Sequence, residues 1–316
     1  MPFIILGGAV AALIILYVAC TAFYFKFAIR GSKADDGKDR EFYEKHGLGE
    51  FVDEIMKGRE VFDKAPFETV EITSFDGLKL RALRVKNENS KGTLIFFHGY
   101  RSLPKYDFAA SYPFYSKFGY DLLFPYQRAH GMSEGKYITF GVKERKDAIK
   151  WIEFINNENG YQKDIYLCGI SMGCATVLMG AGESYPDNVR GIIADCGFTS
   201  PHDIISHVAD KIVKVGKRPL MWSLNLVCKI RAGFTLKEYS TVDAMSNVKC
   251  PIAFFHGEAD DFVPMEMTVR NHDALQGKKF LMTVPFAGHG TSYLYQKEKY
   301  EKAITDFIAD TCSKCE

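Results

Sequence analysis

The sequence predicts an α/β fold, in which helices cover both faces of a mostly parallel β-sheet, preceded by a transmembrane helix at the N-terminus. Two patterns lead to this expectation. Short, nearly continuous apolar segments alternate along the chain with longer segments of helical periodicity, as in parallel sheets that are buried on both faces. The chain also opens with a run of 24 uncharged residues, 2–25.

The first elements expected after this run are an amphipathic helix and a β-hairpin. The helix is expected over residues 41–62, behind a polar linker at 31–40. Two alternating segments, 67–73 and 78–85, flank an Asp-Gly pair. This pair favours a tight turn between antiparallel strands.

The parallel sheet is expected to follow. Its strands are predicted at 93–97, 121–124, 165–168, 191–194, 252–255 and 279–284, and the helices at 142–157, 172–184, 265–275 and 292–311.

These elements suggest one catalytic domain at residues 67–316, preceded by a membrane anchor at 1–30 and by a linker with a packing helix at 31–66. The length of 316 residues would also allow two domains of about 150 residues each, but one large α/β domain accounts for it. Residues 201–250 interrupt the strand pattern, so we expect them to form a helical cap over the mouth of the active site.

The uncharged run is long enough to cross a bilayer once. A helix of 24 residues spans roughly 36 Å, and the hydrocarbon core is roughly 30 Å thick. A cleaved signal, a lipoprotein processed at Cys20 and a soluble amphipathic start remain alternatives, although a signal peptide would be shorter and would follow basic residues. Basic residues follow the run and none precedes it, so we expect a single-pass protein of the cell membrane with a cytoplasmic catalytic domain. These residues are Lys26, Arg30, Lys33, Lys38 and Arg40.

Composition excludes one class of partner. The 40 lysine and arginine residues balance 39 acidic residues, which leaves a net charge of +1. Such a chain has no field that would attract phosphates, so we expect no nucleic-acid partner. The eight cysteines suggest no dense disulfide framework, in agreement with a cytoplasmic domain.

A candidate nucleophile lies at the end of an apolar strand. Gly169, Ser171 and Gly173 form a G-x-S-x-G pattern where a strand is expected to give way to a helix. The pattern sets the serine on a sharp, strained turn that side chains at the flanking positions would block. We therefore predict that Ser171 is the catalytic nucleophile.

An acid and a base follow in the order Ser…Asp…His, which hydrolases of this sheet type use. Asp260 follows an apolar strand in HGEAD, and His289 follows the last strand in GHG. His289 would accept the proton of Ser171 and return it to the leaving group, while Asp260 would hold the imidazole tautomer. Asp261 and Asp195 remain alternatives for the acid.

Two backbone N–H groups are predicted to form an oxyanion hole. One belongs to the loop after the first long parallel strand, which ends in FFHGY, and the other to the residue after the nucleophile. We assign them to Tyr100 and Met172.

With these pieces in order, the sequence resembles the α/β-hydrolase superfamily, closest to the serine-aminopeptidase-like and lysophospholipase-like branch of bacterial hydrolases. The resemblance extends over about residues 67–311 and implies an eight-stranded, mostly parallel sheet with a variable cap, and hydrolysis of esters, amides or thioesters. The loop RAHGMSEG at 128–135 also matches a loop of this superfamily. The resemblance implies that this loop is structural and that His130, within it, has no catalytic role. It rests on SFDGLKL (74–80), FFHGY (96–100), GISMG (169–173), DCGFTS (195–200), HGEADDFVP (256–264) and GHG (288–290).

Other residues carry weaker signals. His98 and His256 each precede a glycine at a strand end and are expected to be buried hydrogen-bonding groups. His202 and His207 are five residues apart, so on a helix they do not share a face; we expect no metal site, and no cofactor is implied. Five apolar cap residues could line an acyl pocket or pack within the cap itself: Met221, Trp222, Leu224, Leu226 and Phe234.

The expected function is that of a membrane-anchored serine hydrolase, which cleaves a carboxylic ester through an acyl-enzyme and favours esters over peptides. Its substrate would be a small or lipid-like acyl compound, and lysolipids, thioesters and amides remain open because a fold does not fix a substrate. An acyltransferase with the same triad and a catalytically silent binding module are the alternatives.

Overall fold

The computed structural model describes residues 2–31, 37–213 and 216–312. The linker expected at 31–40 therefore lies partly outside the described residues, and Lys33 lies outside them entirely.

The expected sheet is confirmed. It has eight strands in the order β1-β2-β4-β3-β5-β6-β7-β8, and β3 to β8 are parallel to one another. The hairpin of β1 and β2 closes through Gly77, which has a φ of 86°, and β2 joins β4 in antiparallel pairing. The strands are β1 (Glu68–Thr73), β2 (Lys79–Val85), β3 (Gly92–Phe97), β4 (Asp121–Pro125), β5 (Asp164–Ile170), β6 (Val189–Asp195), β7 (Ile252–Gly257) and β8 (Lys279–Val284).

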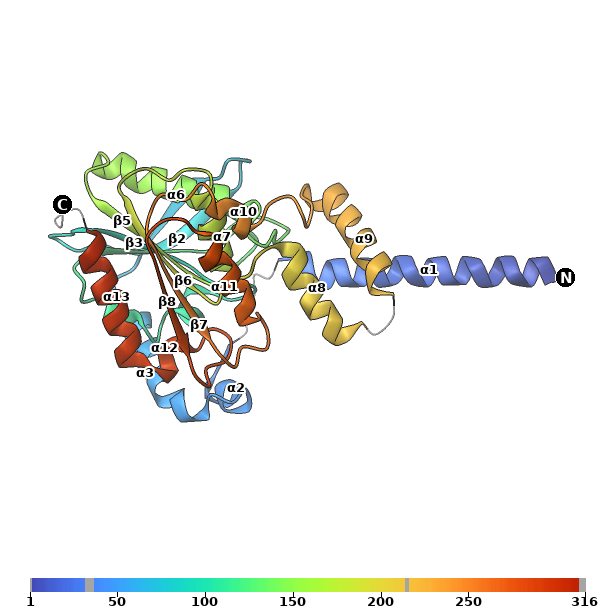
Figure 1. Ribbon diagram of the computed structural model, residues 1–316, viewed down its shortest axis with the longest axis horizontal. Helices are drawn as coiled ribbons and strands as arrows, with labels where there is room; N and C mark the ends of the chain where they lie inside the picture. Colours follow the sequence, from blue (N-terminus) through green and yellow to red (C-terminus); the bar gives the residue numbers. More distant parts are fainter. Residues whose placement is uncertain (1, 32–36, 214–215, 313–316) are drawn as a thin grey trace.

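Helices cover both faces of this sheet (Figure 1). One face packs on aliphatic side chains from α6, α7 and the loop around α10, and the other on an aromatic cluster contributed by α3, α5, α12 and α13. The central strands are buried along their whole length, as expected for a sheet covered on both sides. These helices are α3 (Val52–Asp63), α5 (Tyr112–Tyr115), α6 (Glu144–Asn159), α7 (Met172–Ala181), α10 (Thr241–Met245), α11 (Met265–Ala274), α12 (Ser292–Tyr295) and α13 (Lys297–Thr311).

Two predicted helices are interrupted. The helix expected at 41–62 is divided into α2 (Arg40–Lys45), a 3-10 turn at Gly49–Phe51 and α3. The break follows from Gly47, whose φ of 76° lies outside the helical region. The helix expected at 292–311 is divided at Gln296, which leaves helical geometry at φ −138° and ψ 52°. The short helix α4 (Pro104–Asp107) and α5 were not expected, because four-residue helices leave little periodicity in a sequence.

The insertion forms a smaller cap than 201–250. Its helices α8 (Pro201–Ile212) and α9 (Lys217–Val227) lie to one side of the sheet, toward the N-terminus, and a π-helical turn at Cys228–Ala232 continues α9 (Figure 1). In contrast, α10 packs on α7 and α11, and its Ala244 and Met245 belong to the core beneath the sheet. The cap therefore ends before α10.

Helix α1 (Pro2–Ile29) runs beside α9 and projects from the molecule (Figure 1). Its segment Ala11–Ile29 has a mean hydropathy of 2.0 and is largely exposed. Among the described residues, α1 is the only helix long and apolar enough to cross a membrane. Its end is joined to the main α/β domain, because the backbone N–H of Ile138 donates to the carbonyl of Ile29 at 2.7 Å.

Candidate active site

Ser171 occupies a strained turn between β5 and α7. Its φ of 54° and ψ of −114° are unusual for a residue with a side chain. The flanking glycines explain how the turn is possible. A Cβ atom on Gly169 would lie 2.5 Å from the carbonyl oxygen of Gly173, and one on Gly173 would lie 1.8 Å from that of Phe97. Both positions therefore exclude any side chain, as the motif predicted.

The structure brings the three predicted catalytic side chains together. His289 Nε2 lies 2.9 Å from Ser171 Oγ, and His289 Nδ1 lies 2.7 Å from Asp260 Oδ2. Asp260 comes from the loop after β7 and His289 from the loop after β8, so parallel strands deliver all three to one edge of the sheet. This arrangement is the one required for a base to deprotonate a serine hydroxyl.

Asp260 is held by more than His289. Its Oδ1 accepts hydrogen bonds from the backbone N–H groups of Phe262 at 2.9 Å and Val263 at 2.8 Å. Burial alone would raise the pKa of Asp260, but hydrogen bonds from His256 and His289 outweigh burial and hold this pKa well below its ordinary value. The carboxylate is therefore ionised and fixed in orientation.

The two alternative acids lie elsewhere. Asp195 accepts hydrogen bonds from Tyr300 at 3.0 Å and Ser292 at 3.3 Å. Burial raises its pKa. Asp261 is exposed, and its backbone carbonyl faces His207 and Lys211. Neither carboxylate takes the place of Asp260 beside the histidine.

The loop after β3 lies against Ser171. A Cβ atom on Gly99 would be 3.4 Å from the Cβ atom of Ser171, which places the next residue, Tyr100, beside the nucleophile. Tyr100 and Met172, the two residues assigned to the oxyanion hole, therefore flank Ser171 from the loop and from the first position of α7.

Two buried histidines hold this loop. His98 Nε2 accepts a hydrogen bond from the backbone N–H of Gln127 at 3.1 Å, and His130 Nε2 accepts one from that of Arg101 at 3.0 Å. Burial lowers the pKa of His98 to about 4 and that of His130 to about 3, so both rings are neutral and able to accept. Both histidines therefore act as buried hydrogen-bonding groups that hold the loops in place, as expected from the sequence.

The loop that contains His130 is fixed by a buried ion pair. Arg128 donates to Asp147 at 2.6 Å and to Asp76, in the hairpin turn, at 3.0 Å. The same arginine thereby connects the hairpin, the loop and α6, which supports the structural role that the sequence suggested.

Two cavities meet at Ser171. One has a volume of about 230 Å³ and an apolar lining drawn from the cap, from Tyr100 and from the end of α1. The other has a volume of about 300 Å³ and a mixed lining that includes Lys38, Asp107 and His289. Together they give the nucleophile one side that is almost entirely apolar and one side of mixed character.

The predicted cap residues have different positions. Met221 and Leu224 line the apolar cavity, and Phe234 is buried within the cluster that joins the cap to the main α/β domain. Trp222 and Leu226 are 68% and 41% exposed and lie outside this cavity. The sequence could not distinguish the cavity-lining residues from the exposed ones. Helical periodicity identifies an apolar face, but it does not show whether that face packs against the rest of the protein.

The contribution of α1 to the cavity was not expected. Tyr24, Phe27 and Ala28 form part of its wall. They lie more than 140 residues from Ser171 in the sequence. Tyr24 belongs to the uncharged run at 2–25, and Phe27 and Ala28 follow it after Lys26, so membrane insertion accounted for the apolar character of this segment. No local signal distinguishes them from their neighbours.

The candidate metal ligands belong to the same site. Within the part of the chain that the structure describes, one group of three has its ligand atoms within 4.8 Å of one another: Cys196, Asp260 and His289. Two of its members are already hydrogen-bonded to each other. His202 pairs with Asp203 at 3.4 Å, and His207 faces the backbone carbonyl of Asp261 at 3.3 Å, so each of these histidines has a partner of its own.

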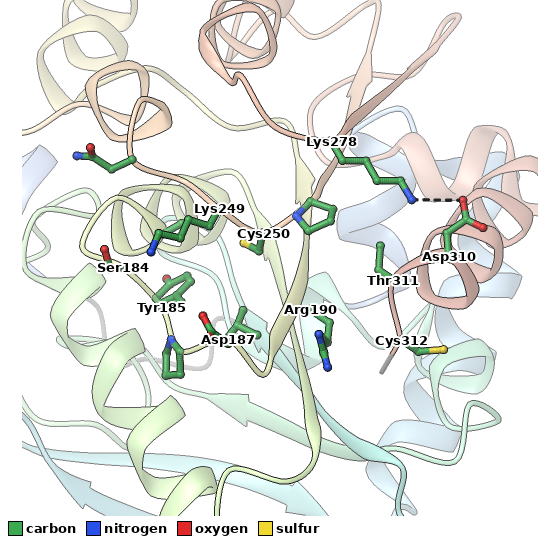
Figure 2. A pocket seen from close by; sticks show the side chains of 15 residues that line it. Ser184, Tyr185, Asp187, Arg190, Lys249, Cys250, Lys278, Asp310, Thr311 and Cys312 are labelled. Carbon is green, nitrogen blue, oxygen red and sulfur yellow. Dashed lines mark ion pairs between the residues drawn. The ribbon is translucent and has the colours of Figure 1, made fainter. Parts of the chain in front are cut away.

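A further cavity of about 310 Å³ lies at the opposite edge of the sheet, where β6, β7 and β8 begin. Figure 2 shows its lining, with the ion pair of Lys278 and Asp310, 3.8 Å apart, at one side. None of the predicted catalytic residues lines it. Ligands of open α/β sheets bind at the carboxyl ends of the strands, which is the edge that carries Ser171.

The sheet order, the strained serine turn and the site at the carboxyl edge define an α/β hydrolase. The prolyl oligopeptidase family matches residues 135–315, a range that contains Ser171, Asp260 and His289, and the chain belongs to this family.

Relatives with similar sequences and folds occur in several organisms. The chain is 26% identical to the protein YqkD of Bacillus subtilis (strain 168) over 81% of its own length and 84% of that protein. It is 24% identical to the membrane protein YNL320W of Saccharomyces cerevisiae, over 78% and 80% of the two chains. The esterase Pf2001 of Pyrococcus furiosus has the same fold, with a TM-score of 0.62, 23% identity and coverage of 79% of this chain and 94% of the esterase.

Proposed function

We propose that the protein is a membrane-anchored serine hydrolase that cleaves a carboxylic ester through an acyl-enzyme on Ser171. One observation carries the proposal, namely the continuous series of contacts from Ser171 Oγ through His289 to Asp260, at 2.9 and 2.7 Å. A serine becomes a strong nucleophile when an adjacent base is itself oriented by a third group.

The reaction takes place in two steps. His289 Nε2 takes the proton from Ser171 as Oγ bonds to the acyl carbon, and the same proton then passes to the leaving alkoxide as the ester C–O bond breaks. Water next attacks the acyl-enzyme, gives a proton to His289 and releases the carboxylic acid while Ser171 regains its proton. The backbone N–H groups of Tyr100 and Met172 stabilise the negative carbonyl oxygen in both steps.

Labelling with a fluorophosphonate tests the nucleophile directly. The full chain in detergent is expected to be labelled, and Ser171→Ala is expected to abolish labelling. Ser292→Ala is a matched control, because Ser292 is buried and faces Asp195 instead of His289. Absence of labelling in the unmodified protein would exclude this function.

Amide cleavage is the second candidate, and the family match favours it. The apolar cavity beside Ser171 instead supports an acyl ester, since apolar pockets with few polar groups suit hydrocarbon chains. Nitrophenyl esters and nitroanilides of the same acyl group distinguish the two. We expect turnover of the esters to exceed that of the anilides, and the reverse order would assign the protein to the peptidases.

The membrane anchor is assigned to α1 and the catalytic domain to the cytoplasm. The support is the apolar helix itself and the basic residues Lys26, Arg30, Lys38 and Arg40 that follow it. A cysteine introduced at Gly37 tests the orientation in intact cells. Its labelling by an impermeant reagent from outside would overturn the assignment.

A further inference from the structure

Helix α1 is packed against the cap as well as joined to the main α/β domain. Tyr17 donates a hydrogen bond to the backbone carbonyl of Pro219 in α9 at 2.6 Å, and the hydroxyls of Thr21 and Ser223 lie 2.9 Å apart in a buried contact. At the end of α1, Tyr100 donates to the carbonyl of Ala28 at 2.9 Å. The helix is therefore fixed at both the cap and the active-site loop.

The end of α1 and the cap enclose the apolar cavity that reaches Ser171. Its wall includes Phe27 and Ala28 from α1 and Met221 and Leu224 from α9. Except for Ser171 and two tyrosines, every lining side chain is purely hydrocarbon or thioether. Such a cavity accepts an acyl tail but provides no partners for a polar group.

The outer face of α1 at this level is also apolar. Val18 and Phe23 are 59% and 63% exposed, and Val18 follows Tyr17, which contacts the cap. If α1 is a membrane anchor, both side chains lie in the uncharged run that crosses the bilayer, so the bilayer reaches the level of the cap.

The cap itself has an apolar outer face. Trp222, Leu226 and Ile230 follow one another at intervals of four residues and are 68%, 41% and 70% exposed. Exposed basic side chains, Lys229 and Arg231, flank this row. An apolar helical face with aromatic and basic residues at its edges is typical of helices that lie in a membrane interface.

From these contacts we infer that the cap is embedded in the membrane interface and that α1 forms one wall of a passage from the bilayer to Ser171. The inference rests on the proposed esterase function. The substrate class is a single-chain lipid ester, whose acyl tail passes from the bilayer into the apolar cavity. Its polar leaving group occupies the mixed cavity on the other side of Ser171.

A substitution that fills the cavity tests the path of the acyl tail. Ala28 lines the cavity and Ala19, on the same helix, is exposed outside it. In the full chain, Ala28→Phe should lower kcat/KM for a dodecanoyl nitrophenyl ester by about tenfold or more, the factor given by losing the burial of roughly two methylenes. The loss should be much smaller for the acetyl ester, whose acyl group is too short to fill the cavity, and Ala19→Phe should change neither.

The outcomes separate the two proposals. If the unmodified protein hydrolyses neither ester and is not labelled by fluorophosphonate, the esterase function itself fails. If it hydrolyses the acetyl ester but Ala28→Phe affects both esters equally, or neither, the passage is refuted and the esterase function stands.

Tryptophan fluorescence tests the position of the cap without relying on activity. The chain has two tryptophans, and Trp151 is buried in α6 beneath the sheet while Trp222 is exposed on α9. In phosphatidylcholine vesicles with brominated acyl chains, the full chain should lose fluorescence relative to unbrominated vesicles, and Trp222→Phe should remove this quenching. Fluorescence that bromination leaves unchanged would overturn the embedded cap.

Discussion

His130 accepts a hydrogen bond from the backbone N–H of Arg101 at 3.0 Å, although the two residues are 29 positions apart in the sequence. Arg101 follows Tyr100 and has a positive φ of 51°, so this hydrogen bond fixes a strained backbone immediately after a residue of the proposed oxyanion hole. A histidine outside the proposed catalytic triad thus fixes the backbone next to a proposed oxyanion-hole donor.

Removing this hydrogen bond should impair catalysis without abolishing binding. We expect His130→Ala to lower kcat by about tenfold to a hundredfold, because small displacements of stabilising groups have effects of this size. KM should change little. His130→Gln retains an acceptor and should recover part of kcat, whereas an equal loss in both variants would indicate a general effect on folding.

Asp260→Asn should preserve the fold and greatly reduce turnover. The asparagine oxygen can still accept from the N–H groups of Phe262 and Val263, but the amide NH₂ then faces His289 Nδ1. The imidazole is expected to adopt the wrong tautomer, with a loss in kcat of about ten-thousandfold. Asp261→Asn is the matched control and should keep nearly full activity. Equal losses in the two variants would contradict the assignment of Asp260.

The motif glycines should be intolerant of any side chain. Gly173→Ala places a Cβ atom 1.8 Å from the carbonyl of Phe97, and we expect the free energy of unfolding to fall by about 3 kcal/mol or more. Gly277→Ala is the control, because its nearest neighbour is 3.9 Å away. Its effect should remain within about 0.5 kcal/mol. Denaturant unfolding measures both, and similar values would contradict the proposed constraint.

Acid should destabilise the protein through its buried histidines. His98 and His130 have pKa values of about 4 and about 3 when folded, below the 6.5 of an exposed histidine. Between about pH 6 and pH 4 the unfolded chain therefore binds more protons than the folded one, and stability falls as pH falls. Each ring contributes a slope of about 1.4 kcal/mol per pH unit.

The variant His130→Gln isolates one of these contributions. Its unfolding free energy should depend on pH less steeply than that of the unmodified protein, by about 1.4 kcal/mol per unit in this range. Identical slopes would show that His130 is not buried in its neutral form.

The sequence was most informative where a short motif dictates a local backbone. The turn at Ser171 needs glycines at fixed positions, and the order of the strands determines that the loops of Asp260 and His289 meet it at one edge. The fold class followed from the alternation of apolar segments and helices. Element ends such as the break at Gln296 could not be foreseen, because they depend on packing and not on local pattern.

Contacts between distant segments were beyond the reach of such patterns. The cap sequence showed apolar residues, but only the structure separates Leu224, in the cavity, from Trp222, on the outer face. In the sequence, membrane insertion is a sufficient explanation for the apolar residues of α1. For this reason the sequence gives no sign that the end of α1 also forms part of the cavity wall.

Ile29 is fully buried in the cluster that also contains Met172, the residue after the nucleophile. The last turn of α1 is consequently both the end of the proposed anchor and a part of the interior of the hydrolase. Cutting the chain near residue 30 to obtain a soluble protein would open the cavity to water. It would also remove the backbone carbonyls of Phe27 and Ala28, which accept hydrogen bonds from the Tyr100 hydroxyl. The specificity of this protein should accordingly be measured with α1 attached, since a trimmed version would report the preferences of a different pocket.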